Sequence, residues 1–252
     1  MPNPINLATS LAATTVTLPR GLMTHAAASQ PELPLELYEM ENCPYCRVVR
    51  EALSALDIAA LVYPCPKRGE RYRPLVVELG GKASFPFLVD PNTGEQMYES
   101  ADIIDYLYRT YGGRRPLPRA AIKLLVQPAA NLASVLRAGA GLRMRPSHAP
   151  EQALELFSLE SSPFARLVRE RLCELELPYR LRNMGRTKAG DFIPPVVRRR
   201  LMPRYAHAGR NRKALAERTG MVQVPYLYDP NTDTGLYESD AIIAYLTETY
   251  AA

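Results

Sequence analysis

The chain contains one sequence pattern twice, and this duplication constrains its fold more than any other feature. Residues 37–47, Leu-Tyr-Glu-Met-Glu-Asn-Cys-Pro-Tyr-Cys-Arg, align with residues 156–166, Leu-Phe-Ser-Leu-Glu-Ser-Ser-Pro-Phe-Ala-Arg. The later matches are residues 85–93 with 224–232 and residues 98–100 with 237–239. With two copies only, we expect a duplicated domain rather than a many-repeat array.

Each unit reads as β-α-β-α-β-β-α, which predicts an α/β fold. In the first unit we expect strands at 35–38, 58–63, 87–89 and 96–98, and helices at 44–56, 72–79 and from 100 to near 111. The short link between the first helix and second strand predicts a parallel crossover, and Asp-Pro-Asn-Thr-Gly predicts a hairpin turn. The predicted organisation is an arm at 1–34, a first domain at 35–112, a partly helical linker at 113–153 and a second domain at 154–252.

Cys43-Pro44-Tyr45-Cys46 stands where the first strand gives way to a helix, as in thiol–disulfide redox sites. Cys43 is expected at the N-cap with Pro44 at the first helical position. Its sulfur would then face free backbone amides and the positive end of the helix dipole, which favour the thiolate. Cys46 returns to the same face one turn later and could resolve a mixed disulfide at Cys43.

Two other uses of this motif are less favoured. Zinc would need two more ligands, but Cys65 and Cys173 are isolated from each other and the three histidines lie far away in sequence, so no metal is expected. A structural disulfide closing so short a loop would remove little chain entropy. We expect Cys65 to lie exposed in a loop and Cys173 to be a small core residue.

The second unit has Ser162 and Ala165 in place of the two cysteines, so it cannot perform dithiol exchange there. Ser162 is interpreted either as a helix N-cap followed by proline or as a hydrogen-bond donor to a bound thiolate. Glu99-Ser100 and Glu238-Ser239 begin the last helix of each unit. A serine N-cap with an adjacent glutamate suits the charged terminus of an amino acid, although such serines are also ordinary caps.

Both units resemble thioredoxin-fold domains of the glutaredoxin and glutathione-transferase N-terminal type. Cys-Pro-Tyr-Cys is the dithiol glutaredoxin motif, and the tandem arrangement resembles proteins with two transferase N-terminal domains. The resemblance implies that glutathione is bound in the first unit by Tyr45, Phe85, Pro86, Glu99 and Ser100. In the second unit it implies Ser162, Val224, Pro225, Glu238 and Ser239, with a cis-proline at Pro86 and Pro225.

The leading hypothesis is a glutathione-linked thiol–disulfide oxidoreductase with Cys43 as nucleophile and Cys46 as resolving thiol. Its cosubstrate would be glutathione, and its partners protein or small-molecule disulfides. One alternative is a transferase or isomerase of the glutathione-transferase or prostaglandin E synthase type, although no helical domain of transferase size follows Tyr250. The other is a scaffold that binds thiol peptides without catalysis.

The remaining segments carry weaker signals. The arm is interpreted as disordered or strapping, with a cytoplasmic protein preferred over an organellar one carrying a transit segment. The linker is expected to pack on the domains rather than on a membrane, and no apolar run is long enough to span one. The insertion at 182–213 is strongly basic, which predicts a solvated loop. Few aromatics interrupt it, so nucleic acid is not an expected partner.

Overall fold

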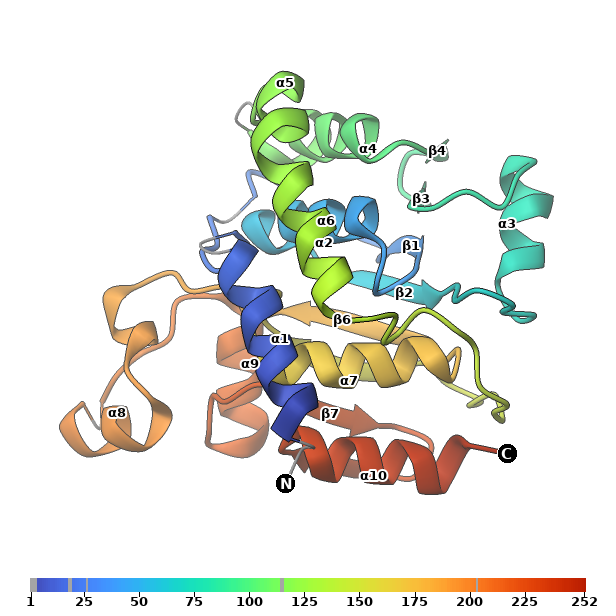
Figure 1. Ribbon diagram of the computed structural model, residues 1–252. Coiled ribbons are helices and arrows are strands. Elements are labelled where there is room, and N and C mark those ends of the chain that lie inside the picture. The colour runs from blue at the N-terminus through green and yellow to red at the C-terminus, as the bar shows by residue number, and fades with distance from the viewer. Residues whose placement is uncertain (1–3, 18–19, 26, 114–115, 203) are drawn as a thin grey trace.

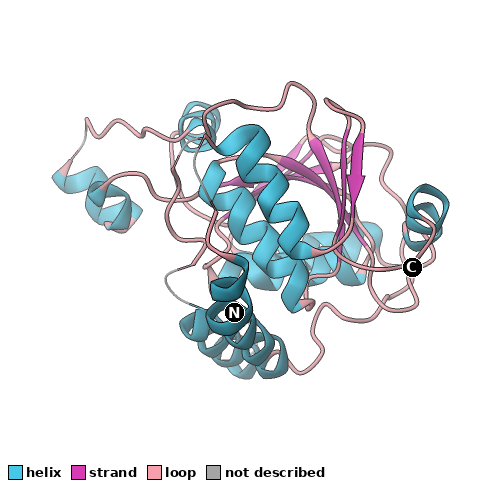
Figure 2. Ribbon diagram, turned by 90° about the horizontal axis from the view of Figure 1, so that it is seen from above, coloured by secondary structure: helices cyan, strands magenta, loops and turns pink. Residues whose placement is uncertain are grey.

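The computed structural model describes residues 4–17, 20–25, 27–113, 116–202 and 204–252. Residues 1–3 of the arm and Arg114 and Arg115 of the linker lie outside these ranges. The two units share one sheet of eight strands in the order β4-β3-β1-β2-β6-β5-β7-β8 (Figure 1). The strands form a single twisted layer with helices packed around it (Figure 2).

The first unit follows the predicted order of elements. Its elements are β1 Leu35–Glu39, α2 Pro44–Leu56, β2 Ala60–Pro64, α3 Arg73–Gly80, β3 Phe87–Asp90, β4 Glu95–Met97 and α4 Ser100–Leu107, followed by a π-helical turn at Tyr108–Gly112. β1 pairs with β2 in parallel and β3 pairs with β4 as an antiparallel hairpin, as the connections predict.

The second unit repeats this order with an insertion after its second strand. Its elements are β5 Leu154–Ser158, α7 Pro163–Glu174, β6 Tyr179–Asn183, a 3-10 turn at Ala189–Phe192, α8 Pro195–Leu201, α9 Arg210–Thr219, β7 Tyr226–Asp229, β8 Thr234–Tyr237 and α10 Ser239–Tyr250. Each hairpin is tied to the last helix of its unit by an aspartate. Asp90 accepts from Tyr106 and Tyr111, and Asp229 accepts from Tyr245 and Tyr250.

The units join edge to edge through β2 and β6. These strands run antiparallel, with Ala60 opposite Leu181 and Val62 opposite Tyr179. By the alignment, Ala60 matches Tyr179 and Val62 matches Leu181, so the pairing is symmetric about the centre of the junction. The duplicated chain is therefore arranged like a twofold dimer whose subunits are covalently linked.

Alternating residues of the strands build a core on each face. Leu35, Leu37 and Leu88 pack against α2 and α4, whereas Tyr38 and Phe87 pack on the side of α3. This alternation is the period of two that a strand imposes. The first helix of each unit is thus buried against the sheet, and its N-terminus is held at a fixed place.

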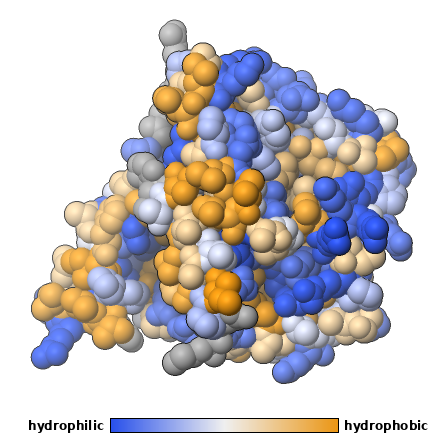
Figure 3. Space-filling view, in the orientation of Figure 1, coloured by the Kyte–Doolittle hydropathy of each residue, from blue (hydrophilic) through white to orange (hydrophobic). Residues whose placement is uncertain are grey.

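The arm and linker form helices that cover the units. α1, Pro4–Thr17, packs across α7 and α6, so the arm is a strap (Figure 1). In the linker, a short α5 at Arg119–Ala121 and a π-helical stretch at Ile122–Val126 lead into α6, Gln127–Leu136. Ile122, Val126 and Ala130 join the first unit's core, which confirms packing on the domains. Hydrophobic residues, Leu132 and Val135 among them, also gather on the outer side of α6 (Figure 3).

Candidate functional site

The first turn of α2 places the dithiol as the sequence predicts. Cys43 is the N-cap, with extended dihedrals of φ −91° and ψ 121°, and Pro44 begins the helix. The backbone N–H of Cys46 donates to the Cys43 sulfur at 3.4 Å. All four cysteines have free thiols in this structure.

The two sulfurs differ in acidity. The pKa of Cys43 is lowered to about 7, chiefly by the hydrogen bond from the Cys46 side chain. Burial opposes this effect, while the backbone N–H groups of Cys46 and Tyr45 and the charge of Arg50 add to it. Burial, followed by the hydrogen bond to Cys43, raises the pKa of Cys46 well above its usual value. Cys43 is therefore the thiolate of the pair and Cys46 the thiol.

The prediction of an exposed Cys65 is wrong. Cys65 is completely buried, because its backbone N–H continues the ladder by donating to the Glu39 carbonyl at 2.6 Å and aromatic residues including Tyr38 and Tyr72 pack around it. Cys173 is buried as predicted and its sulfur accepts from the Glu41 N–H. Burial raises the pKa of both thiols, so neither is an activated nucleophile.

The sheet register brings the other predicted residues of the first unit to the same edge as Cys43. Tyr38, near the end of β1, pairs with Phe87 at the start of β3. The β3–β4 register, with Leu88 opposite Met97, puts Phe85-Pro86 before β3 and Glu99-Ser100 after β4 at this same edge. The Phe85–Pro86 peptide is cis, as is Val224–Pro225, and Phe85 and Val224 both precede the paired strand residues. Tyr45 is half exposed on the first turn of α2.

Glu99 and Glu238 have a backbone conformation that the sequence did not reveal. Their φ angles are 63° and 67° with ψ angles of 114° and 123°, a region that residues with a Cβ rarely adopt. Holding such a conformation costs on the order of 1–3 kcal/mol and is most often found at functional sites. Both glutamates are exposed while Ser100 and Ser239 are buried at the following helix starts.

Ser162 of the second unit has nearly the same geometry as Cys43. Its dihedrals are φ −92° and ψ 121°, and its hydroxyl oxygen accepts from the Ala165 N–H at 3.2 Å. It therefore caps α7. Gln223, which sequence reasoning missed, donates to the Glu238 carboxylate at 2.6 Å; the first unit has Ser84 at the matching position.

A cavity of about 610 Å³ opens beside Ser162. Ser162, Gln223 and Val224 are among the residues that line it. α1 and the insertion also line it, through Leu11 and Phe192 among others. α1 is fastened there by the Ser10 hydroxyl, which donates to the Pro163 carbonyl at 2.7 Å. The strap thus covers the second unit's site.

The prediction that 182–213 is a solvated loop is wrong. Its single acid, Asp191, is buried and accepts from the backbone of Thr187, while Arg212 and His207 pair with it. The backbone N–H of Thr187 and the charge of Arg212 hold the pKa of Asp191 at about 2, against the opposing effect of burial. Part of the segment is therefore folded around one buried carboxylate, which basic side chains of the same segment contact.

A buried group of five charged residues, here called the central ion cluster, lies between the units: Glu39, Glu41, Arg50, Glu160 and Arg169. Arg50 forms two hydrogen bonds with Glu160, at 3.0 and 3.3 Å, and also pairs with Glu39. Arg169 forms two with Glu41, both at 3.1 Å. Sequence reasoning noted these residues only as parts of the repeat, because nothing local indicates that they meet.

Burial has opposite outcomes within this cluster. It raises the pKa of Glu39 to about 8, with Arg50 only partly opposing it. Burial also disfavours the charged form of Glu160, but Arg169, Arg50 and Arg47 outweigh it and lower that pKa strongly. The cluster therefore holds Glu160 as an anion and Glu39 as a group that titrates near neutral pH.

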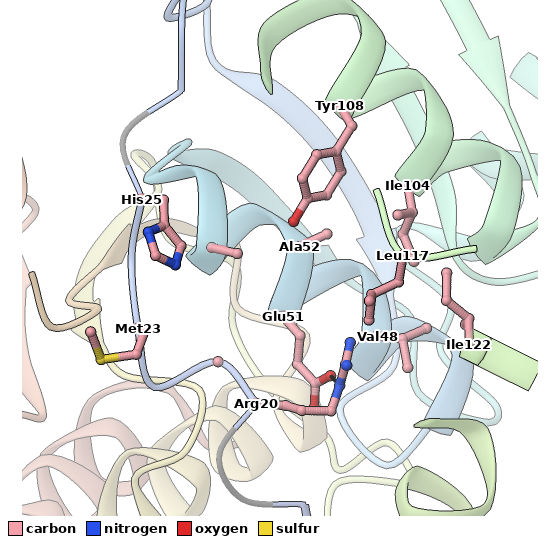
Figure 4. Close-up of a pocket in the computed structure, with 12 residues that line it drawn as sticks. Arg20, Met23, His25, Val48, Glu51, Ala52, Ile104, Tyr108, Leu117 and Ile122 are labelled. Atoms are coloured by element: carbon pink, nitrogen blue, oxygen red, sulfur yellow. Dashed lines mark hydrogen bonds and ion pairs between the residues drawn. The ribbon is translucent and has the colours of Figure 1, made fainter. Parts of the chain in front are cut away.

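A separate pocket of about 190 Å³ lies along the side of α2 away from the cysteines. Figure 4 shows Val48, Glu51 and Ala52 on one side of it and Tyr108 and Ile104 on another. Arg20 crosses its edge to pair with Glu51 at 2.6 Å. It contains none of the residues that the sequence predicts for the site.

Among the residues that the structure describes, no group of three or more histidine, cysteine or acidic side chains is placed to hold a metal ion. Within the same described ranges, no helix has the length and hydropathy needed to cross a membrane.

Comparison with known protein families shows which family both units match. The family described as "Glutathione S-transferase, N-terminal domain" matches residues 37–115 and 156–252, together more than half of the chain. No curated protein matches it. Among solved structures, a glutathione transferase of Bombyx mori, BmGSTD1, is 26% identical over 38% of this chain and 46% of that protein, with a TM-score of 0.31.

A delta-class glutathione transferase of Nilaparvata lugens is 30% identical over 31% of this chain and 37% of that protein, with a TM-score of 0.27. The chain thus spans less than half the length of either transferase. The family match covers both units, one after the other. The chain therefore belongs to the glutathione S-transferase N-terminal domain family and contains two such thioredoxin-like domains in tandem.

Proposed function

We propose that the protein is a glutathione-linked thiol–disulfide oxidoreductase that acts through Cys43 and Cys46. The observation that carries this proposal is the dithiol at the start of α2, with Cys43 as the N-cap and Cys46 one turn later. Cys43 has a pKa of about 7 at a helix N-cap, and Cys46 donates to it while its own pKa is raised. A nucleophile with a pKa near neutral and a protonated partner one turn away are what stepwise disulfide exchange requires.

In the first step the Cys43 thiolate attacks the glutathionyl sulfur of a mixed disulfide. The Cys43–glutathione disulfide forms, the original disulfide breaks, and the released substrate thiolate takes a proton. A thiolate of free glutathione then attacks the glutathionyl sulfur, giving oxidised glutathione and regenerating the Cys43 thiolate. Alternatively, Cys46 loses its proton and attacks Cys43, which releases glutathione and leaves the Cys43–Cys46 disulfide for reduction by two further glutathione molecules.

The surroundings of Cys43 suit glutathione as the reductant. Phe85 lies outside the paired part of β3, and we propose that its free backbone groups pair with the cysteinyl residue of the tripeptide. The exposed Glu99 carboxylate can accept from an ammonium group, and the start of α4 at Ser100 can receive a carboxylate. The strained φ of Glu99 supports a role in binding.

In the second unit we assign glutathione binding without redox turnover. Ser162 lacks a thiol, and its hydroxyl could at most donate to a bound thiolate. One observation favours a second function, S-transfer: the cavity beside Ser162 is also lined by apolar residues, including Leu11 and Phe192. Apolar lining residues of this kind could hold an electrophile next to a bound tripeptide.

The test separates the two reactions in the intact protein. Purified protein is given a glutathionylated peptide and, separately, an aromatic electrophile, each with reduced glutathione, and both products are followed. We expect peptide reduction that Cys43→Ser abolishes and Ser162→Ala preserves. Electrophile conjugation that only Ser162→Ala abolishes would favour the transferase reaction. Loss of neither activity in either variant, or glutathione binding without turnover, would refute the oxidoreductase and favour a binding protein.

A further inference from the structure

The central ion cluster links each unit's site loop to the other unit's helix. Glu41 lies two residues before Cys43, and its carboxylate receives two bonds from Arg169 of α7. Glu160 lies two residues before Ser162, and its carboxylate receives two bonds from Arg50 of α2. Since the alignment matches Glu41 with Glu160 and Arg50 with Arg169, these are two copies of one contact across the pseudo-twofold axis.

The cluster is too well buried for these bonds to be ordinary surface ion pairs. The side chains of Arg50 and Arg169 are at most 1% exposed, and those of the glutamates at most 3%. Two parallel N–H···O bonds to a carboxylate fix its position as well as its charge. Removing one partner of such a buried pair leaves an uncompensated charge and is strongly destabilising.

The groups that act directly on the Cys43 sulfur belong to the first unit, and the second unit reaches them through Arg50 and Glu41. α2 contributes Cys46 and Arg50, which lie on the same side of the helix as Cys43, and β1 contributes Glu39. Behind Arg50 lie Glu41 and Arg47 of the first unit. The second unit contributes Glu160, Arg166 and Arg169, which act on the same carboxylates. Arg50 also pairs with Glu41, with 3.1 Å between its Nη2 and the carboxylate. If Arg169 no longer held Glu41, this carboxylate would bind Arg50 more closely and weaken the effect of the Arg50 charge on the Cys43 thiolate.

We infer that Arg169 of the second unit is a positioning residue for the Cys43 site, acting through Glu41. The inference rests on the proposed function of Cys43 as the reactive thiol. It gives the second unit, which has no cysteines at its own site, a direct part in the first: its helix α7 holds the loop that delivers Cys43 to the start of α2. The dithiol site is then a product of the duplication and is incomplete in either unit alone.

The test measures the pH dependence of Cys43 alkylation in the intact protein. Arg169→Met removes both bonds and the charge, so Glu41 competes for Arg50 and the loop relaxes. We expect the midpoint of the alkylation profile to rise by about one pH unit from about 7, which lowers the thiolate fraction at pH 7 about five-fold. Arg169→Lys keeps the charge but not the paired bonds, and its midpoint should lie between those of wild type and Arg169→Met.

The matched control is Arg137→Met. Arg137 is another buried arginine with two bonds to a glutamate of α7, Glu170, at 2.6 and 2.7 Å, but it does not contact the loop that carries Cys43. It should destabilise the protein and leave the Cys43 midpoint unchanged. Equal midpoints in wild type and Arg169→Lys, or the same rise in Arg137→Met, would overturn the inference. If Arg169→Met does not fold, Arg169→Lys still decides.

Alkylation does not depend on turnover with glutathione. A higher Cys43 midpoint in the Arg169 variants would therefore support the positioning role, even if the wild-type protein cannot reduce glutathionylated peptide. Failure of the wild-type protein to reduce the peptide would refute only the proposed function. An unchanged midpoint in the Arg169 variants, together with peptide reduction by the wild-type protein, would support the proposed function and refute the positioning role.

Discussion

The hydrogen bond that Cys46 donates to Cys43 can be tested by comparing two substitutions at one position. The pKa of Cys43 lies at about 7 against an ordinary 9.0, and the Cys46 side chain is the largest cause. Two pKa units correspond to about 2.7 kcal/mol in favour of the thiolate. Cys46→Ala removes the side-chain donor, while Cys46→Ser retains a hydroxyl that can still donate.

The assay is the rate of alkylation of the reduced protein as a function of pH, with the labelled cysteine identified by mass spectrometry. In wild type, about one tenth of Cys43 should be thiolate at pH 6. If Cys46→Ala raises the midpoint by about one unit, this fraction falls about ten-fold, and Cys46→Ser should stay close to wild type. Equal midpoints in wild type and Cys46→Ala, or faster labelling of Cys65, would refute the reasoning.

Three further predictions follow from the same contacts. Cys43→Ser should abolish reduction of a glutathionylated peptide, whereas Cys46→Ser should keep part of it because glutathione can resolve the intermediate. An equal loss of peptide reduction in the two variants would contradict these roles. Glu39 has a folded pKa of about 8 against 4.5, so the unfolded chain loses this proton first and folding stability should fall as pH rises from about 5 to about 8. Urea unfolding across that range should show that Glu39→Gln loses less free energy of unfolding than wild type does. An equal loss in the two proteins would argue against a buried titrating carboxyl. Ser162→Ala should lower the free energy of unfolding by about 1 kcal/mol through loss of the α7 cap, without changing the rate of disulfide reduction. An unchanged melting temperature in thermal unfolding would show that Ser162 does not act as a cap.

Local features of the fold could be predicted from the sequence because each has a local cause. Pro44 after Cys43 and Pro163 after Ser162 mark helix starts, and the structure confirms both caps. The Asp-Pro-Asn-Thr turns give hairpins in both units. Where the sequence repeats, the backbone repeats too, down to the positive φ of Glu99 and Glu238.

What could not be predicted depends on contacts between the units. Leu61 and Arg180 face each other across the β2–β6 junction, but an edge strand has no sequence signal for the strand it will pair with. The misplacement of Cys65 has the same origin, because a Pro-Cys-Pro stretch indicates a loop locally and only the surrounding aromatic side chains bury it. Arg50 and Glu160 lie 110 residues apart in the chain, so no local pattern could indicate their pairing.

The cysteine to which glutathione becomes attached decides whether Cys43 is the nucleophile. The measurement is the intact mass of Cys46→Ser after incubation with oxidised glutathione, followed by peptide mapping. With the resolving thiol absent, we predict one glutathionyl group per chain, located on Cys43 and removed by reduced glutathione. A chain that stays unmodified, or one whose adduct maps to Cys65 or Cys173, would contradict the assignment of Cys43 as the nucleophile.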